Sequence, residues 1–241
     1  MNLEHLELFV RFCPGAKHVN LYVDEDGHLL TPLTRLTCLQ ELKLLACNFY
    51  SDRVDRLLRE RGCELTLLHL EHVDQLDMSA LCIIAETCPL LRKLVFFSCD
   101  FVENFGNSEN NREFSTAPFL HLESMVCVSE SAPNVIEFLL IHALNLQYVQ
   151  FGSTAWFNDA IVGNVLSRNA LKKVEEIRIL RSYELSMQAV RSLINECPNL
   201  KVLAEMDGWE GIAESELREL RAEIKQKNWD LDTFISWSVT G

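Results

Sequence analysis

The feature that most constrains this chain is a short leucine pattern that returns along almost its whole length. Residues 88–100 read CPLLRKLVFFSCD, in which Leu91, Leu94, Phe96 and Cys99 give the spacing L-x-x-L-x-F-x-x-C. The corresponding first positions of the units are Leu39, Leu65, Leu91, Leu122, Leu146, Val174 and Leu200. A unit of this size cannot bury its apolar side alone, so neighbouring units must stack on one another. The pattern therefore predicts an elongated solenoid.

Each unit is expected to contain a short strand followed by a helix. Side chains alternate between the faces of a strand, so the repeated leucines share the buried face. Helical spacing between the strands predicts helices over Asp52–Glu60, Met78–Thr87, Pro133–Ala143, Phe157–Asn169 and Ser186–Glu196. The expected N-caps are Asp52 for the first, Asp77 or Ser79 for the second, and Ser186 for the last. The first intervals of roughly 26 residues lie within the 20–29 residues typical of leucine-rich repeats. The predicted fold is α/β: a leucine-rich-repeat solenoid with a curved parallel sheet on the concave side and helices on the convex side.

The two ends and one internal segment depart from the repeat. Residues Leu3–Phe12 fit a helix or a strand, whereas Glu214–Lys227 fits a helix with one apolar face, and WDLDTFISW after it alternates like a strand. We therefore predict a solenoid over residues 1–208 and a C-terminal capping segment over residues 209–241. The polar stretch Asp100–Pro118 predicts an exposed loop, either a tolerated insertion or a functional one.

Charge and cysteine content restrict the classes of partner and the compartment. The net charge of -13 disfavours nucleic acid and anionic membrane surfaces as partners. No apolar run approaches the ~20 residues of a membrane span, and the N-terminal residues are acidic where a signal peptide is basic. The nine cysteines are an odd number and lie mostly in apolar segments, which indicates reduced thiols. We expect a cytoplasmic protein, and the same features also fit a nuclear one.

The residue types that could carry chemistry do not form a recognisable site. Cys63, His69 and His72 are close in sequence, but in a strand the two histidines point to opposite faces, so no metal site is expected. Asp24–Gly27 reads DEDG like the start of a calcium loop, yet Arg35 stands where that loop needs a glutamate. Phosphate-binding, dinucleotide and nucleophile-elbow motifs are absent from the sequence. We predict no cofactor and no enzymatic activity, and the remaining catalytic alternative is a hydrolase site within Asp100–Pro118.

The strand residues between the buried leucines should point outward on the concave face, where a partner protein would bind. The candidate partner-binding residues are Tyr22, Lys43, His69, Glu71, Lys93, Val95, Phe97, Val126, Val128, Tyr148 and Arg178. Four of them, Val95, Phe97, Val126 and Val128, are expected to form a contiguous exposed apolar patch, and such patches mark protein contacts. The alternative is that loops of the chain itself cover this face, or that the curvature differs and the patch is partly buried.

Cysteine-proline pairs before the strands and cysteines after them give the units a further signature. The pairs are Cys88-Pro89, Cys197-Pro198 and Cys13-Pro14, and the later cysteines are Cys47 and Cys99. These units resemble the cysteine-containing leucine-rich repeats of F-box/LRR proteins. The resemblance implies a domain that recognises substrates for an SCF-type E3 ubiquitin ligase, joined to a Skp-type adaptor and cullin through an F-box. That box is not found in this sequence, so a free-standing leucine-rich-repeat scaffold or inhibitor unrelated to ubiquitination is the alternative.

Overall fold

The repeated strands form one parallel sheet with helices along its other side. The computed structural model describes residues 3–23, 30–102, 118–129 and 133–233. Within them the strand order is β1-β2-β3-β4-β5-β6-β7-β8, and β9 pairs with β7. The strands are β1 His18–Tyr22, β2 Glu41–Asn48, β3 Leu67–Asp74, β4 Lys93–Phe97, β5 Ser124–Val128, β6 Tyr148–Asn158, β7 Glu176–Ser186, β8 Val202–Ala204 and β9 Trp209–Gly211.

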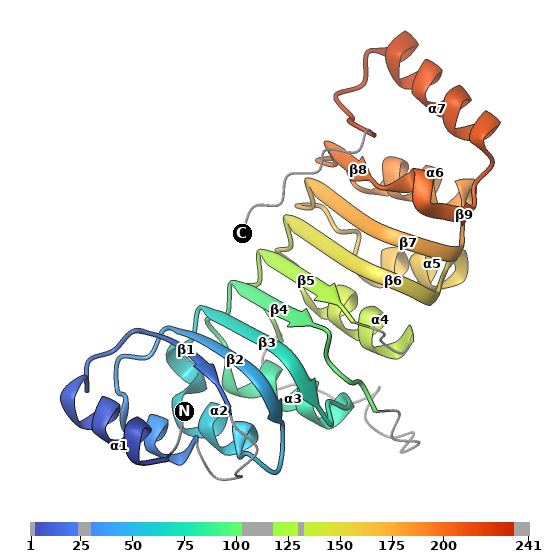
Figure 1. The fold of residues 1–241 in the computed structure, drawn as a ribbon. Coiled ribbons are helices and arrows are strands. Elements are labelled where there is room, and N and C mark those ends of the chain that lie inside the picture. Colours follow the sequence, from blue (N-terminus) through green and yellow to red (C-terminus); the bar gives the residue numbers. More distant parts are fainter. Residues whose placement is uncertain (1–2, 24–29, 103–117, 130–132, 234–241) are drawn as a thin grey trace.

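The helices occupy the convex side and both ends of the stack. They are α1 Leu3–Phe12, α2 Val54–Arg61, α3 Met78–Thr87, α4 Pro133–His142, α5 Asp159–Arg168, α6 Met187–Glu196 and α7 Glu214–Lys227, with short 3-10 helices η1 Thr31–Arg35, η2 Gly62–Glu64 and η3 Met206–Gly208. Figure 1 shows β1 to β8 side by side, α2 to α6 lining one side of the sheet, α1 at the N-terminal end and α7 at the C-terminal end. This arrangement confirms the predicted leucine-rich-repeat solenoid.

The strand register places equivalent positions of the repeat side by side. Leu42 pairs with Leu68, Leu68 with Leu94, and Leu94 with Met125, all of them fully buried. The same line continues through Val149, Ile177 and Leu203. Burying this apolar line is the main favourable contribution to stacking, at about 25 cal/mol per Å² of apolar area. The predicted phase of the repeat is therefore confirmed strand by strand.

Three strands bend at equivalent positions. Ala46, His72 and Ser98 follow the outward-facing part of β2, β3 and β4, and each has a positive φ of about 50°. The register passes over the first two of them, since Leu45 pairs with Glu71 and then Cys47 pairs with Val73. The bend turns Cys47 and Cys99 inward, where each is 6% exposed. All nine cysteines are free thiols, as predicted, and six are buried: Cys47, Cys82, Cys88, Cys99, Cys127 and Cys197.

The helix starts agree with the sequence in two cases and differ in one. Asp77 caps α3 by accepting from Ala80 N at 2.8 Å, and Ser186 caps α6 by accepting from Gln188 N at 3.1 Å. Asp52 was expected to cap the next helix, but its carboxylate instead accepts from Asn48 N at 2.6 Å. Arg53, in the left-handed conformation, takes the cap position of α2. That expectation was wrong because Asp52 closes the preceding turn.

The segment after residue 208 packs on the last repeat. The Trp209 ring is buried, and its Nε1 donates to Ile179 O at 2.9 Å. Leu217 and Leu220 of α7 lie in the same hydrophobic core, and Asp232 makes an isolated parallel bridge to Val202. The predicted strand over WDLDTFISW is wrong for residues 229–233, which form only the isolated bridge at Asp232. The rest of that stretch, the Asp24–Gly27 turn and most of the Asp100–Pro118 loop lie outside the described residues.

Candidate partner-binding surface

The outward-facing strand residues form three rows that run across the sheet. The first row is His18, Glu41, Leu67, Lys93, Ser124, Tyr148, Glu176 and Val202. The middle row is Asn20, Lys43, His69, Val95, Val126, Gln150, Arg178 and Ala204. The third row is Tyr22, Leu45, Glu71, Phe97 and Val128, and Leu180 of β7 continues it beyond Gly152. All eleven predicted partner-binding residues therefore lie in these rows.

A small group of charged side chains occupies the part of the face formed by β2 and β3. Lys43 Nζ lies 2.9 Å from a carboxylate oxygen of Glu71, and both side chains are largely shielded from solvent. The hydrogen bond from Lys43 lowers the pKa of the Glu71 carboxyl. His69 Nε2 is 3.3 Å from the same carboxylate but is buried without a well-oriented hydrogen-bond partner. The group combines a fixed ion pair with an imidazole nitrogen that lacks a partner.

The protonation of His69 follows from the same surroundings. Burial lowers the pKa of its imidazole, and the positive charge of Lys43 lowers this pKa further. The Glu71 carboxylate acts in the opposite direction and raises it. The net effect is a lowered pKa, which favours the neutral imidazole at neutral pH. At this place the face therefore presents one cation, one anion and a neutral ring.

A second polar group lies on β6 and β7. Arg178 Nε donates to a carboxylate oxygen of Glu176, and the Tyr148 hydroxyl donates to Gln150 Oε1 at 2.5 Å. Burial raises the pKa of the Tyr148 hydroxyl, and the negative charge of Glu176 adds to this effect. These internal contacts hold the four side chains in fixed positions. A partner would therefore meet oriented donors and acceptors here.

The bulky apolar side chains of the third row are exposed. Tyr22 is 62% exposed, Phe97 41% and Leu180 40%. Within the described part of the chain, no loop buries these three side chains. Leu180 lies outside the predicted set of residues. Its sequence signal is its position two residues after Arg178, which gives it the same outward orientation.

One predicted contact residue is not accessible. Val95 lies in the middle row between His69 and Val126, but it is only 6% exposed. It does not belong to the hydrophobic core cluster, so it is covered from the concave side by its neighbours. Val126 and Val128 are of intermediate exposure. The predicted apolar patch of four exposed residues is therefore wrong for Val95, and Phe97 is the one member of the four in the exposed class.

The described residues contain neither a metal-binding group of side chains nor a helix that could span a membrane. No group of three or more His, Cys, Asp or Glu side chains in them is arranged to hold a metal ion. None of the helices in the described ranges is both long and apolar enough to span a bilayer. His69 lies in the middle row of β3, whereas His72 has a left-handed backbone and is exposed.

Comparison with known proteins gives a likeness in fold alone. No protein-family model matches the sequence, and no curated protein matches it. Among solved structures, the chain is similar to an LRR protein of Leptospira interrogans, with 14% sequence identity and a TM-score of 0.45. The match covers 84% of this chain and 50% of that protein, so the chain spans half its length. The repeat and the strand register, described above, define the class: the chain is a leucine-rich-repeat solenoid. Solenoids of this kind offer extended concave surfaces for binding.

Proposed function

We propose that the protein is a non-catalytic interaction scaffold that binds a polypeptide on its concave face. The observation that carries this proposal is the third row, where Tyr22, Phe97 and Leu180 expose large apolar side chains. Removing such side chains from water is favourable, and no described element of the chain covers them. Their position on a rigid parallel sheet means that little conformational entropy is lost on binding.

The polar groups beside the third row would determine which polypeptide binds. Lys43 with Glu71, and Arg178 with Glu176, are ion pairs within the chain, so they offer partly satisfied charges. Partly satisfied charges contribute more to orientation and selectivity than to affinity. Lys93 of the first row is exposed and adds a positive charge to β4, the strand that also carries Phe97. We infer that apolar contacts supply the affinity and that the charged pairs select the partner.

The proposal can be tested by affinity capture from cell extract with quantitative mass spectrometry. The test variant carries Phe97→Ser and Leu180→Ser, which remove two exposed contacts from the third row. The matched control is Leu144→Ser, because Leu144 is 46% exposed but lies in the turn between α4 and β6. We expect polypeptides that bind the wild type and the Leu144 variant to be lost from the double variant.

Two outcomes would contradict the proposal. In one, the double variant retains the same captured polypeptides as the wild type. In the other, the double variant unfolds, since this would mean that Phe97 and Leu180 are structural. Circular dichroism and the thermal midpoint distinguish loss of binding from loss of folding. A direct binding assay with each purified candidate then establishes whether the contact is immediate.

A narrower form of the proposal comes from the resemblance to F-box/LRR proteins. In that form, the bound polypeptide is a substrate presented to an SCF-type ubiquitin ligase in the cytoplasm or nucleus. Support for it is limited to the cysteine pattern of the repeats. Binding of a purified Skp-type adaptor to the full-length protein would favour it. If polypeptides bind the concave face but no adaptor does, the free-standing scaffold or inhibitor is the correct form.

A further inference from the structure

Helix α1 has a solvent-facing side that no described element covers. Its inner side is fixed to the core by Leu6 and Val10, which are 1% and 3% exposed. With 3.6 residues per turn, Glu4, Leu8 and Arg11 form a stripe on the opposite side of the helix. Leu8 is 48% exposed, and Phe12, one turn further along, is 74% exposed. Leu8 therefore faces outward between Glu4 and Arg11, and Phe12 directly follows Arg11, at the N-terminal end of the stack (Figure 1).

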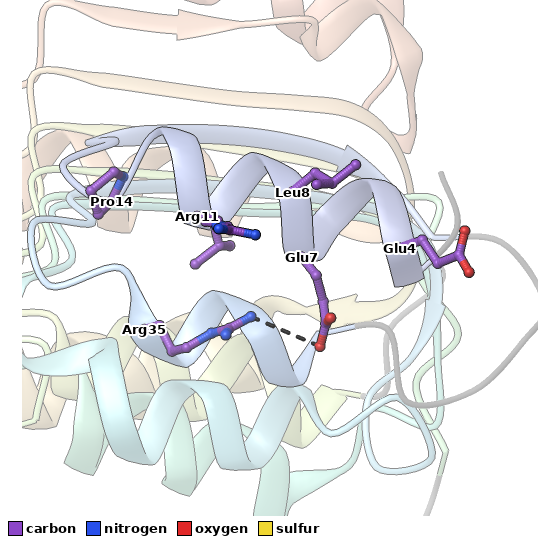
Figure 2. A pocket seen from close by; sticks show the side chains of 7 residues that line it. Glu4, Glu7, Leu8, Arg11, Pro14 and Arg35 are labelled. Atoms are coloured by element: carbon purple, nitrogen blue, oxygen red, sulfur yellow. Dashed lines mark ion pairs between the residues drawn. The ribbon is translucent and has the colours of Figure 1, made fainter.

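The charged residues on this side of α1 differ in whether they are paired within the chain. A groove of about 600 Å³ lies beside α1 and is lined in part by Glu7, Pro14 and Arg35. Figure 2 shows these side chains. Glu7 points across the groove to Arg35, with 4.0 Å between carboxylate and guanidinium. No ion pair within the described residues involves Glu4 or Arg11. The Arg11 guanidinium lies 6.0 Å from the centre of the Phe12 ring. The two ends of the stripe are thus one acid and one base whose charges are available.

We propose that this stripe is an interface between two copies of this chain, with their α1 helices antiparallel across a two-fold axis. Glu4 and Arg11 lie at equal distances from the midpoint of the stripe, about 5 Å along the helix axis at 1.5 Å per residue. Antiparallel pairing therefore places each Glu4 opposite the Arg11 of the other copy, so the dimer contains two of these contacts. Leu8 lies next to the midpoint, so the two Leu8 side chains meet close to the axis.

The stripe favours a second copy over an unrelated partner because it complements itself. A parallel arrangement would set Glu4 against Glu4 and Arg11 against Arg11, which is repulsive. A two-fold axis makes every favourable contact occur twice, and two-fold dimers are the commonest symmetric assemblies. The interface joins the N-terminal ends of two solenoids and leaves the concave faces of both free. The inference is therefore independent of the function proposed above.

The test is sedimentation equilibrium of the full-length protein over a wide concentration range. A reductant is included because Cys13, next to Phe12, is exposed and could otherwise cross-link copies. We expect a monomer–dimer equilibrium for the wild type. Glu4→Arg or Arg11→Glu alone turns two attractive contacts into repulsive ones and should weaken association by about tenfold. The control Glu219→Arg changes an exposed charge on α7 and should leave association unchanged.

An equimolar mixture of the Glu4→Arg and Arg11→Glu variants gives the decisive measurement. In the mixed dimer, both stripe ends of the first variant are basic and both stripe ends of the second are acidic. Opposite charges therefore face each other at both contacts, and association should return to within about threefold of the wild type. The altered side chains are exposed, and circular dichroism should show that both variants remain folded. The proposal is overturned if the wild type is monomeric at every concentration, or if the mixture associates no better than the single variants.

Discussion

His69 shows how the surroundings of one residue set its chemistry. It lies on β3 between Lys43 of β2 and Val95 of β4, in the middle row of the concave face. Its ring is half-buried, and Nε2 has no well-oriented partner. The ion pair beside it is internal, so the ring is subject to both a positive and a negative charge. These opposing influences can be separated by substitution.

We predict that His69 titrates below the ordinary histidine value of about 6.5. Burial and Lys43 both lower this pKa, so Lys43→Met should raise it, whereas Glu71→Gln should lower it further. The chemical shift of the His69 ring in an NMR pH titration measures each change. Titration of His69 at or above its ordinary value would contradict the arrangement described here.

The lowered pKa of His69 also affects stability in a defined direction. Near pH 6 the folded chain binds fewer protons at His69 than the unfolded chain, so the free energy of unfolding rises with pH. This contribution is complete above the unfolded pKa and is lost as the pH falls through the folded pKa. Burial lowers the pKa of His142 as well. His69→Gln should therefore reduce this pH dependence without abolishing it.

The residue scale is also where prediction from sequence was least complete. Alternation along β4 placed Val95 and Phe97 on the same face, and the structure agrees. Alternation could not show which of the two side chains is exposed. Val95 is covered because it lies between the side chains of two flanking strands in the middle row. Exposure on a concave sheet depends on neighbours from other repeats, and these lie far away in the sequence. Alternation also places Leu180 on the concave face with Arg178, but it did not mark Leu180 as an exposed contact residue, for the same reason.

At the scale of the elements, helix caps join the repeats to one another. Asp77 Oδ1 accepts from Ala80 N at 2.8 Å, which caps α3. The same oxygen accepts from the Tyr50 hydroxyl at 2.7 Å, and Tyr50 belongs to the preceding repeat. One carboxylate oxygen therefore starts a helix and ties it to the neighbouring unit. Sequence spacing indicated the cap but not the contact with Tyr50.

Asp77→Ala should lower the free energy of unfolding by about 1–2 kcal/mol, since it removes the cap and leaves a hydroxyl without its acceptor. Denaturant titration measures this change. Asp77→Asn keeps an oxygen acceptor at the same place and is expected to cost less. Tyr50→Phe retains the cap, so its cost isolates the contact between repeats. A loss for Asp77→Ala no larger than for Asp77→Asn would show that the cap contributes little.

The elements also show why one helix start was predicted wrongly. Asp52 stands before an apolar helical pattern, which is the usual position of a cap. Its carboxylate is instead used by Asn48 N at the end of β2. The N–H of Asn48 and the N–H groups in the first turn of the helix compete for this carboxylate. The turn after the strand determines which of them is satisfied. That turn includes a left-handed Arg53, which has no local signal in the sequence.

Over the whole molecule, the fold was predictable because one rule is repeated. Each unit provides the same apolar spacing, so an error in a single unit does not change the architecture. The strand order and the line from Leu42 to Leu203 follow directly from that spacing. What spacing cannot provide is the identity of a partner, since the concave face carries both signs of charge and apolar groups.

The distribution of thiols gives a prediction for the molecule as a whole. Burial raises the pKa of Cys47, Cys88 and Cys197 to about 12, and such thiols are unreactive at neutral pH. Cys13 and Cys63 are exposed. Iodoacetamide should therefore modify Cys13 and Cys63 first in the native protein. Mass spectrometry of peptides identifies the modified positions.

The control for this prediction is labelling in guanidinium chloride, where all nine cysteines should react. A Cys13→Ser, Cys63→Ser variant should lose the fast phase in the native protein. Rapid native labelling of Cys88 or Cys197 would mean that the core opens far more readily than the packed solenoid implies.

The regular spacing of the strands restricts the conformation of a polypeptide that binds along the third row. Neighbouring strands are about 4.8 Å apart, close to the 5.4 Å pitch of an α-helix. Same-side residues of an extended chain are about 6.6 Å apart. A bound helix that lies across the strands would place one side chain per turn near each successive strand, and its spacing would stay close to that of the strands over several repeats. An extended polypeptide would lose this match after two or three adjacent strands, so contacts on several neighbouring strands of the third row favour an amphipathic helix.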